Sequence, residues 1–134
     1  MRFTGDAARL PLQEQAKIFY WAAKIGVQPE FLAAIRMAEN GGPGREFGVL
    51  SQEANTYDLQ CKLAALSIRN NLFRFVTDNS NMWPTVNDRY SNVFIAYMGR
   101  RWAPVGARND PNGLNKNWIV NVTNFYKETG VEEV

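Results

Sequence analysis

The chain of 134 residues contains no histidine and only one cysteine, and these absences exclude several kinds of chemistry. Without histidine there can be no Ser-His-Asp triad, no Cys-His pair and no zinc-binding helix of the HExxH type. One cysteine cannot form an internal disulfide, nor a zinc or iron–sulfur site built from several thiolates. Carboxylates are therefore the side chains expected to carry any catalysis.

Long apolar runs and a large net charge are also absent. The longest uncharged apolar run covers residues 93–98, far short of the roughly 20 residues that span a bilayer. The first residues lack the apolar segment typical of a secretory signal. Lys and Arg number 15 against 13 Asp and Glu, too small an excess to indicate a nucleic-acid-binding protein. We expect no cofactor, no metal, and neither nucleic acid nor membrane as a partner.

Apolar residues recur every three or four positions through most of the chain, which predicts a mainly α-helical protein. Five helices are expected, beginning near residues 12, 29, 57, 87 and 115. Asn40 and the glycines after it end the second helix, and Thr56 is the expected N-cap of the third. Residues 45–55 fit either a short strand or an extended loop. No repeat or linker divides the chain, so residues 1–134 are expected to form one domain.

The third helix has two neighbouring sets of apolar residues. One stripe holds Leu59, Leu63, Leu66 and Phe73, and beside it lie Ile68, Leu72 and Phe75. We expect this stripe to face the core. Cys61, one position away from it, is expected to be a packing residue.

Glu39 is the candidate catalytic residue. It follows Phe31, Leu32 and Ile35 at spacings that place it on the apolar face of the second helix, at the last position before the glycines. Burial and the negative end of the helix dipole both disfavour a charged carboxylate there. A glutamic acid that stays protonated near neutral pH can serve as a general acid in glycosidic cleavage. On spacing alone, a partly exposed glutamate at a frayed helix end is the commoner interpretation.

The residues around Glu39 resemble a known pair of motifs. Ala38-Glu39-Asn40-Gly41-Gly42, followed by Phe47-Gly48-Val49-Leu50-Ser51, resembles the Glu-Ser-Gly and Gly-Leu-Met-Gln motifs of lytic transglycosylases and goose-type lysozymes. The segment 95–99, Ile-Ala-Tyr-Met-Gly, is similar to the Ala-Tyr-Asn-Ala-Gly motif of the same family. The resemblance implies that Glu39 is the catalytic acid, that the segment ending at Ser51 lines a saccharide cleft, and that Tyr97 is a cleft tyrosine whose hydroxyl holds Glu39 or an N-acetyl group.

Other segments resemble small phage-borne proteins of the lysozyme-like superfamily. They cover residues 42–51, 56–60, 101–107, 109–115 and 117–118, and so extend over most of the chain. The resemblance implies a single lysozyme-like domain of about five helices, with a short extended or β-like segment near residues 45–55. Three positions depart from the family pattern: Asn40 stands in place of Ser, Ser51 in place of Gln, and Met98 in place of Asn.

Several aromatic residues are candidates for contact with sugar rings. At helical spacing such residues are more often part of the core, which we expect for Tyr90 and Trp118. Trp83, in a polar segment before a proline, fits an exposed platform for a sugar ring. The predicted substrate-binding residues are Ser51, Tyr57, Trp83, Tyr97 and Trp102.

A second carboxylate would be required for direct attack by water, about 6.5–9.5 Å from the acid in an inverting glycosidase and about 5–5.5 Å in a retaining one. Glu46, Glu53 and Asp58 are the nearby acids, and no spacing singles one out; Glu46 also fits a solvated loop charge. Lytic transglycosylases, as the resemblance implies, need one glutamate. It protonates the leaving oxygen, the N-acetyl group of the substrate stabilises the sugar cation, and the glutamate then deprotonates the 6-hydroxyl to close a 1,6-anhydro ring.

The expected function is therefore cleavage of the MurNAc–GlcNAc backbone of bacterial peptidoglycan, with the transglycosylase mechanism favoured over hydrolysis. The expected partners are glycan strands and other phage virion proteins. The expected location is the virion or the host cell, with action at the cell wall. An alternative is a catalytically inactive phage structural or adaptor module; the residues Asn40, Ser51 and Met98 favour it, whereas Glu39 favours an enzyme.

A third interpretation involves the basic residues near the fourth helix. Arg100, Arg101 and Arg108 form a local basic cluster, which fits contact with anionic peptidoglycan, another subunit or a nucleic acid, and also fits a solvated face. Binding that weakens strongly with salt would indicate a nucleic acid.

Overall fold

The computed structural model describes residues 1–78, 90–103, 113 and 115–133. These residues form five α-helices, which confirms the prediction of a mainly α-helical protein. The helices are α1 (Leu12–Ile25), α2 (Pro29–Glu39), α3 (Tyr57–Asp78), α4 (Asn92–Trp102) and α5 (Lys116–Lys127). A 3-10 helix (Asp6–Arg9) follows the strand β1 (Arg2–Gly5), and a second strand, β2 (Thr129–Glu132), follows α5.

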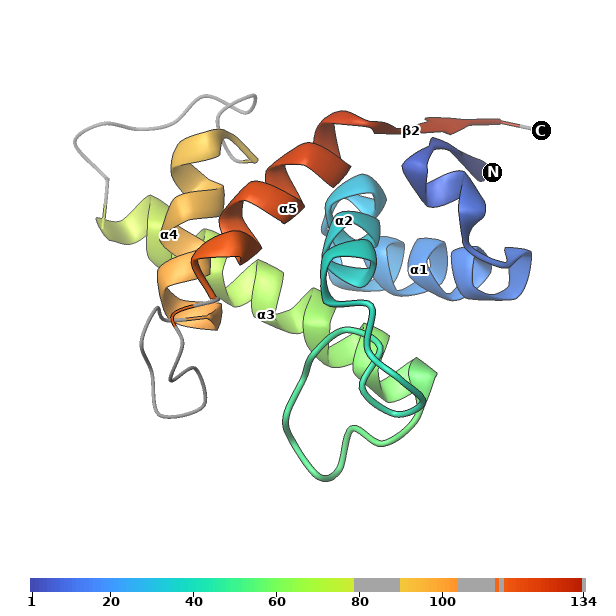
Figure 1. Ribbon diagram of the computed structural model, residues 1–134, viewed down its shortest axis with the longest axis horizontal. Coiled ribbons are helices and arrows are strands. Elements are labelled where there is room, and N and C mark those ends of the chain that lie inside the picture. Colours follow the sequence, from blue (N-terminus) through green and yellow to red (C-terminus); the bar gives the residue numbers. More distant parts are fainter. Residues whose placement is uncertain (79–89, 104–112, 114, 134) are drawn as a thin grey trace.

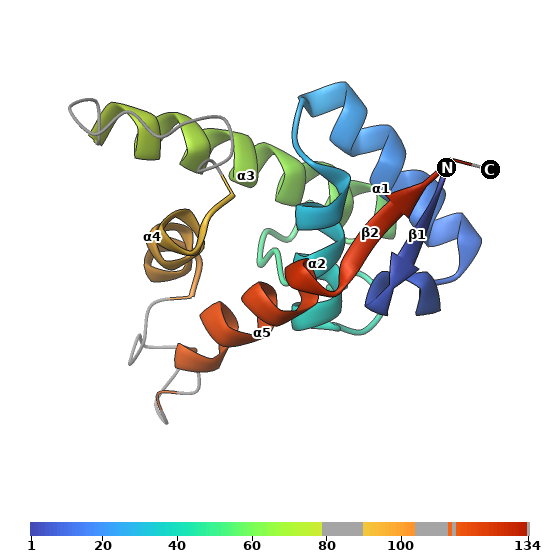
Figure 2. The same ribbon diagram turned by 90° about the horizontal axis from the view of Figure 1, so that it is seen from above.

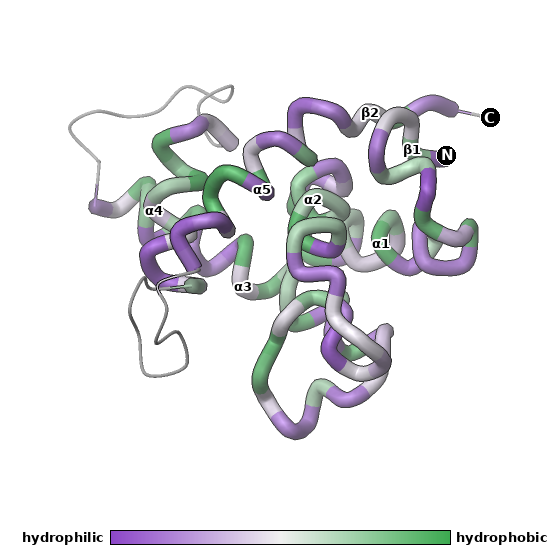
Figure 3. Tube along the Cα trace, viewed as in Figure 1, coloured by the Kyte–Doolittle hydropathy of each residue, from purple (hydrophilic) through white to green (hydrophobic). Residues whose placement is uncertain are grey.

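Helix α2 lies at the centre of the molecule and contacts α1, α3, α5 and β2 (Figures 1 and 2). Every side chain from Phe31 to Ile35 is fully buried, and Arg36 is 9% exposed. In Figure 3 the green of hydrophobic residues follows α2 and turns to purple where the helix ends. A helix segment that is buried on all sides is typical of a core position. The packing around α2 therefore fixes the position of its last residue, Glu39.

An aromatic cluster holds α4 and α5 against α2. The ring of Phe31 lies 5.3 Å from that of Tyr90, 5.7 Å from that of Phe94 and 5.6 Å from that of Tyr126, between ring centroids. These separations fall in the range of favourable aromatic pairs. The expectation that Tyr90 packs against the core is confirmed.

The expected end of the second helix and the expected cap of the third are confirmed, whereas one expected helix start is wrong. Helix α1 ends at Gly26, which has φ +92°, and α2 ends before Asn40. The Thr56 hydroxyl accepts the backbone N–H of Leu59 at 3.2 Å, which confirms it as an N-cap. The expected start of the fourth helix at residue 87 or 88 is wrong. Helix α4 begins at Asn92, because the Ser91 side chain caps it by accepting the N–H of Phe94.

Helix α3 buries a different face from the one expected. Leu59 and Phe73, two members of the expected stripe, are exposed. The buried residues are Gln60, Cys61, Ala64, Ala65, Ile68, Asn71, Leu72 and Phe75. Small side chains in the first half of this set let α3 approach α1 closely, while Leu63 and Leu66 are only half-buried. Cys61 is fully buried, which confirms it as a packing residue.

The strands form a small sheet that the sequence pattern did not predict. β1 and β2 pair antiparallel, with Phe3 opposite Val131, and bring the two ends of the chain side by side (Figure 1). Residues 45–55 contain no strand, so of the two alternatives for that segment the structure favours the loop. The sheet packs on α2 through β2.

Candidate active site

The end of α2 places the carboxyl group of Glu39. Asn40, directly after it, has φ 44° and ψ 41°, the left-handed conformation that asparagine tolerates better than most residues. Its backbone N–H still donates to the carbonyl of Arg36 at 2.9 Å. The helix therefore stops at Glu39, and the chain turns away from a half-buried carboxyl at the negative end of the helix dipole.

Two tryptophans bind one oxygen of this carboxyl. The indole Nε1 of Trp102, the last residue of α4, and that of Trp118, in the first turn of α5, each donate to Glu39 Oε1 at 2.9 Å. The two rings lie face to face, with centroids 6.2 Å apart and planes 28° apart. A carboxyl oxygen has two lone pairs, so these bonds use the accepting capacity of Oε1. They also join α2, α4 and α5 at one point.

Gly48 lies against the other carboxyl oxygen, Oε2. It has φ +72°, and a Cβ built on it would lie 2.3 Å from Glu39 Oε2 and 2.4 Å from Cδ. Both the left-handed backbone and the close approach require glycine at this position. The structure thus brings Gly48 of the second motif to the glutamate of the first, although no hydrogen bond to Oε2 is found among the described residues.

Gln60 holds the loop that carries Gly48. Its side chain is fully buried. Its Oε1 accepts the backbone N–H groups of Phe47 and Val49, each at 3.2 Å, and its Nε2 donates to the carbonyls of Val49 and Ala54 at 2.8 and 2.6 Å. One side-chain amide therefore supplies hydrogen-bond partners to backbone groups on both sides of Gly48 along the chain. Gln60 was not predicted as a site residue, but its place on the face of Ala64 and Ile68 was a signal that it is buried.

The pKa of the Glu39 carboxyl is raised above its ordinary value of 4.5. Burial is the largest cause, because it removes water from the charged form. The two indole N–H groups act in the opposite direction, by stabilising the carboxylate, and their effect is smaller. Burial therefore shifts this carboxyl toward its protonated form relative to a carboxyl in water, and no charged group of the described residues contributes to the shift.

Trp102 and Trp118 both reach Glu39, although different roles were predicted for them. Trp102 was predicted to bind substrate, and its ring is half-buried beside the carboxyl. Trp118 was expected to be part of the core, which its 7% exposure confirms, yet its indole N–H also contacts Glu39. No sequence pattern indicated this second contact, because it depends on how α5 packs on α2.

Tyr57 lies in a different group of residues. Its ring packs edge-on against Phe47, and the charged groups of Lys17 and Arg36 lie 5.6 and 5.8 Å from its centre. Burial raises the pKa of its hydroxyl. Arg36 also binds Glu14, Nε to Oε1, at 2.9 Å. No contact among the described residues joins Tyr57 to Glu39.

Tyr97 points elsewhere than expected. Its hydroxyl donates to Asp78 Oδ2 at 2.7 Å, at the end of α3, and its ring packs against Phe75. The expectation that this hydroxyl holds Glu39 is therefore wrong, and its contact with an N-acetyl group stays a prediction. Ser51 is exposed, and no described contact brings it to Glu39. Trp83 lies outside the described residues.

Among the nearby acids, Glu46 has a carboxylate that is not fully solvated. One of its carboxylate oxygens, Oε1, is buried, and no donor reaches it within the described part of the chain. Glu53 and Asp58 are exposed, and Asp58 accepts the indole N–H of Trp21 at 2.9 Å. In the described ranges, no three Cys, Asp or Glu side chains are grouped as metal ligands would be.

Comparisons of the chain with protein-family models, with curated proteins and with solved structures find no match. The lysozyme-like resemblance therefore stays a hypothesis. None of the helices in residues 1–78, 90–103 and 115–133 is long and apolar enough to cross a membrane.

Proposed function

We propose that this chain cleaves the glycan backbone of bacterial peptidoglycan with Glu39 as general acid and base. The observation that carries the proposal is the environment of the Glu39 carboxyl. Burial raises its pKa, both indole donors bind Oε1, and Gly48 lies against Oε2. A protonated, positioned carboxyl is what protonation of a glycosidic oxygen requires.

The two oxygens have different tasks in this proposal. Because Oε1 already accepts two hydrogen bonds, the acidic proton of the neutral form belongs on Oε2. Oε2 gives this proton to the leaving oxygen as the glycosidic bond breaks and a sugar cation forms. The indole N–H groups then stabilise the carboxylate that is left, which is ready to accept a proton in the second half of the reaction.

The isolation of Glu39 supports the transglycosylase mechanism over hydrolysis. A neighbouring carboxylate would raise the pKa of Glu39 by charge repulsion, yet no charged group in the described part of the chain is among the causes of its shift. In a one-acid mechanism the N-acetyl group of the substrate stabilises the cation. Glu39 then removes the proton of the 6-hydroxyl, and the oxygen closes a 1,6-anhydro ring. We place this activity in phage infection, with delivery to the cell wall by the virion or a holin-type pore.

The same contacts also favour a second candidate function. Glu39 joins α2, α4 and α5 through its two tryptophans, which is a structural task that needs no chemistry. The hydroxyl of Tyr97 is directed to Asp78 rather than to Glu39. Both observations fit a structural or adaptor module of a phage that keeps the fold without catalysis.

Digestion of purified peptidoglycan separates these candidates. The wild type and the variants Glu39→Gln, Glu46→Gln and Glu53→Gln are incubated with peptidoglycan, and the soluble products are identified by mass. Glutamine keeps an acceptor for both indoles, so Glu39→Gln should fold, and circular dichroism checks this. The exposed Glu53 is the matched control.

Anhydro-muropeptides released by the wild type and by Glu53→Gln, but not by Glu39→Gln, are the expected result. Reducing ends that also disappear in Glu46→Gln would instead indicate a two-carboxylate hydrolase. No release by the folded wild type would refute the enzyme and leave the structural module.

A further inference from the structure

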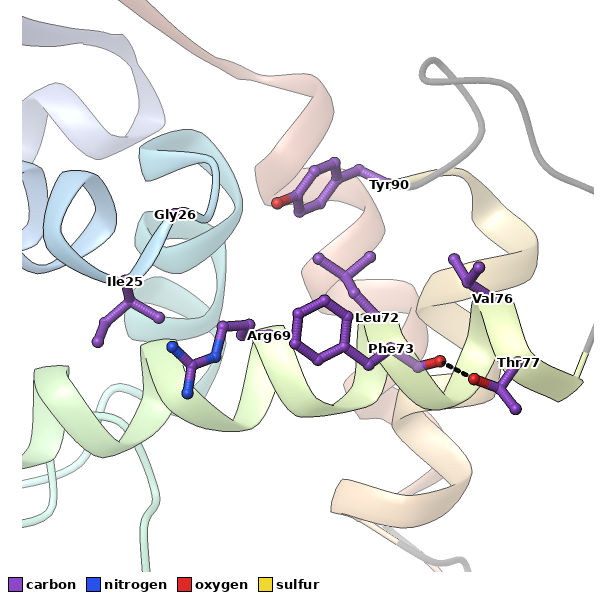
Figure 4. A pocket seen from close by; sticks show the side chains of 8 residues that line it. All are labelled: Ile25, Gly26, Arg69, Leu72, Phe73, Val76, Thr77 and Tyr90. Carbon is purple, nitrogen blue, oxygen red and sulfur yellow. Dashed lines mark hydrogen bonds between the residues drawn. The ribbon is translucent and has the colours of Figure 1, made fainter.

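A second candidate site lies away from Glu39, on the side of α3 near the end of α1 (Figure 4). A cavity of about 450 Å³ opens there, within the usual range for small-molecule sites. Its walls come from the last turn of α1, the second half of α3, and Tyr90 just before α4. None of these elements supplies a contact to the Glu39 carboxyl, so the cavity is independent of the proposed active site.

The walls are mainly apolar. Ile25, Leu72, Phe73 and Val76 line the cavity together with the ring of Tyr90. Phe73 is 66% exposed, although phenylalanine is among the residues most often buried in proteins. Figure 4 shows its ring lying along α3, between Arg69 and Thr77. This wall therefore offers an apolar surface that the described part of the chain does not cover.

Arg69 supplies the single charge among the described residues that line the cavity. Its Nε is buried and has no hydrogen-bond acceptor, and no ion pair of Arg69 is found among the described residues. A buried donor without an acceptor costs free energy, more so when the group is charged. In Figure 4 its guanidinium turns toward Ile25, at the negative end of the α1 dipole, which eases this cost without supplying a hydrogen bond.

The other polar side chains of the wall already form hydrogen bonds within the protein. The Thr77 hydroxyl donates to the carbonyl of Phe73 at 2.8 Å, and the Tyr90 hydroxyl accepts the backbone N–H of Gln28 at 3.0 Å. The described lining contains no acidic side chain that would repel an anion. Arg69 is thus the group left to fix the orientation of a ligand.

We propose that this cavity binds a small carboxylate with an apolar body. Arginine pairs with carboxylates through parallel N–H···O bonds, and one guanidinium matches one negative charge. The apolar body of the ligand lies along Leu72, Phe73 and Val76 and removes that wall from water. A neutral ligand would leave Arg69 unpaired, and a cation would be repelled by it.

The test uses three probes of equal chain length: octanoate, octanol and octylammonium. Binding to the full chain is measured by titration calorimetry, and NMR follows the Nε–H signal of Arg69. The wild type is compared with Arg69→Gln, Arg69→Lys and Phe73→Gln. Arg74→Gln is the matched control, because Arg74 is exposed on the same helix and does not line the cavity.

The wild type is expected to bind octanoate about tenfold or more tightly than octanol, since a charge-assisted pair is worth at least that factor, and octylammonium least. Octanoate should shift the Nε–H signal of Arg69. Arg69→Gln should bind octanoate and octanol equally, Arg69→Lys and Arg74→Gln should keep the preference, and Phe73→Gln should weaken both ligands. Failure of the folded wild type to bind octanoate, or an unchanged preference in Arg69→Gln, would overturn the proposal.

Discussion

Replacing Gly48 by alanine is expected to disturb the Glu39 carboxyl directly. The new Cβ would lie 2.3 Å from Oε2, where ordinary contacts begin at 3.4 Å. The carboxyl must therefore retreat by about 1 Å, or the loop must move by as much. Since both indole bonds are 2.9 Å long, a shift of this size takes at least one of them beyond hydrogen-bonding distance.

Two separate effects lower the unfolding free energy of Gly48→Ala. A left-handed backbone costs a residue with a Cβ roughly 1–2 kcal/mol. A buried indole N–H that loses its acceptor costs roughly another 1–3 kcal/mol. Gly26→Ala should incur only the first part, because Gly26 has φ +92° but no atom within 4 Å of its Cβ position. Gly42→Ala should incur neither, since it has open space and no positive φ.

Urea unfolding of the three variants, followed by circular dichroism, measures these free energies. Gly48→Ala should be less stable than Gly26→Ala by roughly 1–3 kcal/mol, and Gly42→Ala should be close to the wild type. In the peptidoglycan assay Gly48→Ala should also lose about 100-fold in rate, because misplacement by about 1 Å can cost that factor. Equal stabilities of Gly48→Ala and Gly26→Ala would refute the contact between Gly48 and Glu39.

Three further predictions concern the same site. Gln60→Leu should destabilise the fold by roughly 3 kcal/mol or more, because buried loop groups lose their partners, whereas the exposed control Gln52→Leu should be neutral in urea unfolding. The stability of the wild type should fall relative to Glu39→Gln as pH rises above about 4.5, because the raised pKa lets the folded state keep a proton that the unfolded state releases; parallel pH curves of unfolding free energy would contradict this. Trp102→Phe should raise the pKa of Glu39 further, measured by carbon NMR, because it removes a donor to the carboxylate; Trp21→Phe, whose indole binds Asp58 instead, should not.

Local signals in the sequence predicted those parts of the structure that depend on neighbouring residues. The end of α2 at Glu39 follows from Asn40 and the glycines, and the start of α3 follows from Thr56. Glu39 could be chosen from the sequence because its place on an apolar helix face coincides with the motif residues around it. The raised pKa follows from that placement, with burial as its main cause.

The parts of the site that could not be predicted depend on contacts between residues that are far apart in the chain. Trp118 and Glu39 are separated by 79 positions, and only the crossing of α2 and α5 brings them together. Gln60 acts on the backbone of a loop that has no periodic pattern. No sequence pattern pointed to Asp78 as the partner of the Tyr97 hydroxyl, but in the fold this hydroxyl donates to Asp78.

The buried face of α3 shows a related limit. Hydrophobicity alone favoured the large residues Leu59 and Phe73, but Cys61, Ala64 and Ala65 face the core. Close packing against α1 rewards small side chains at the contact, and this preference is invisible when residues are ranked only by how apolar they are. The exposed Phe73 is the consequence, and it is also a wall of the proposed carboxylate site.

The terminal sheet determines how the chain would respond to a pulling force. In the antiparallel pair, Arg2 lies opposite Glu132 and Gly5 opposite Thr129, so tension applied to the two ends loads the rungs one after another, as in a zipper. The first residue pair, Arg2 and Glu132, is exposed and offers little resistance. The next contains Phe3, which is buried, stacks on Phe19 at 4.4 Å and donates its N–H to the Gln15 side chain. Peeling should therefore halt at Phe3, and the helices that hold Glu39 should be shielded from tension until that anchor gives way.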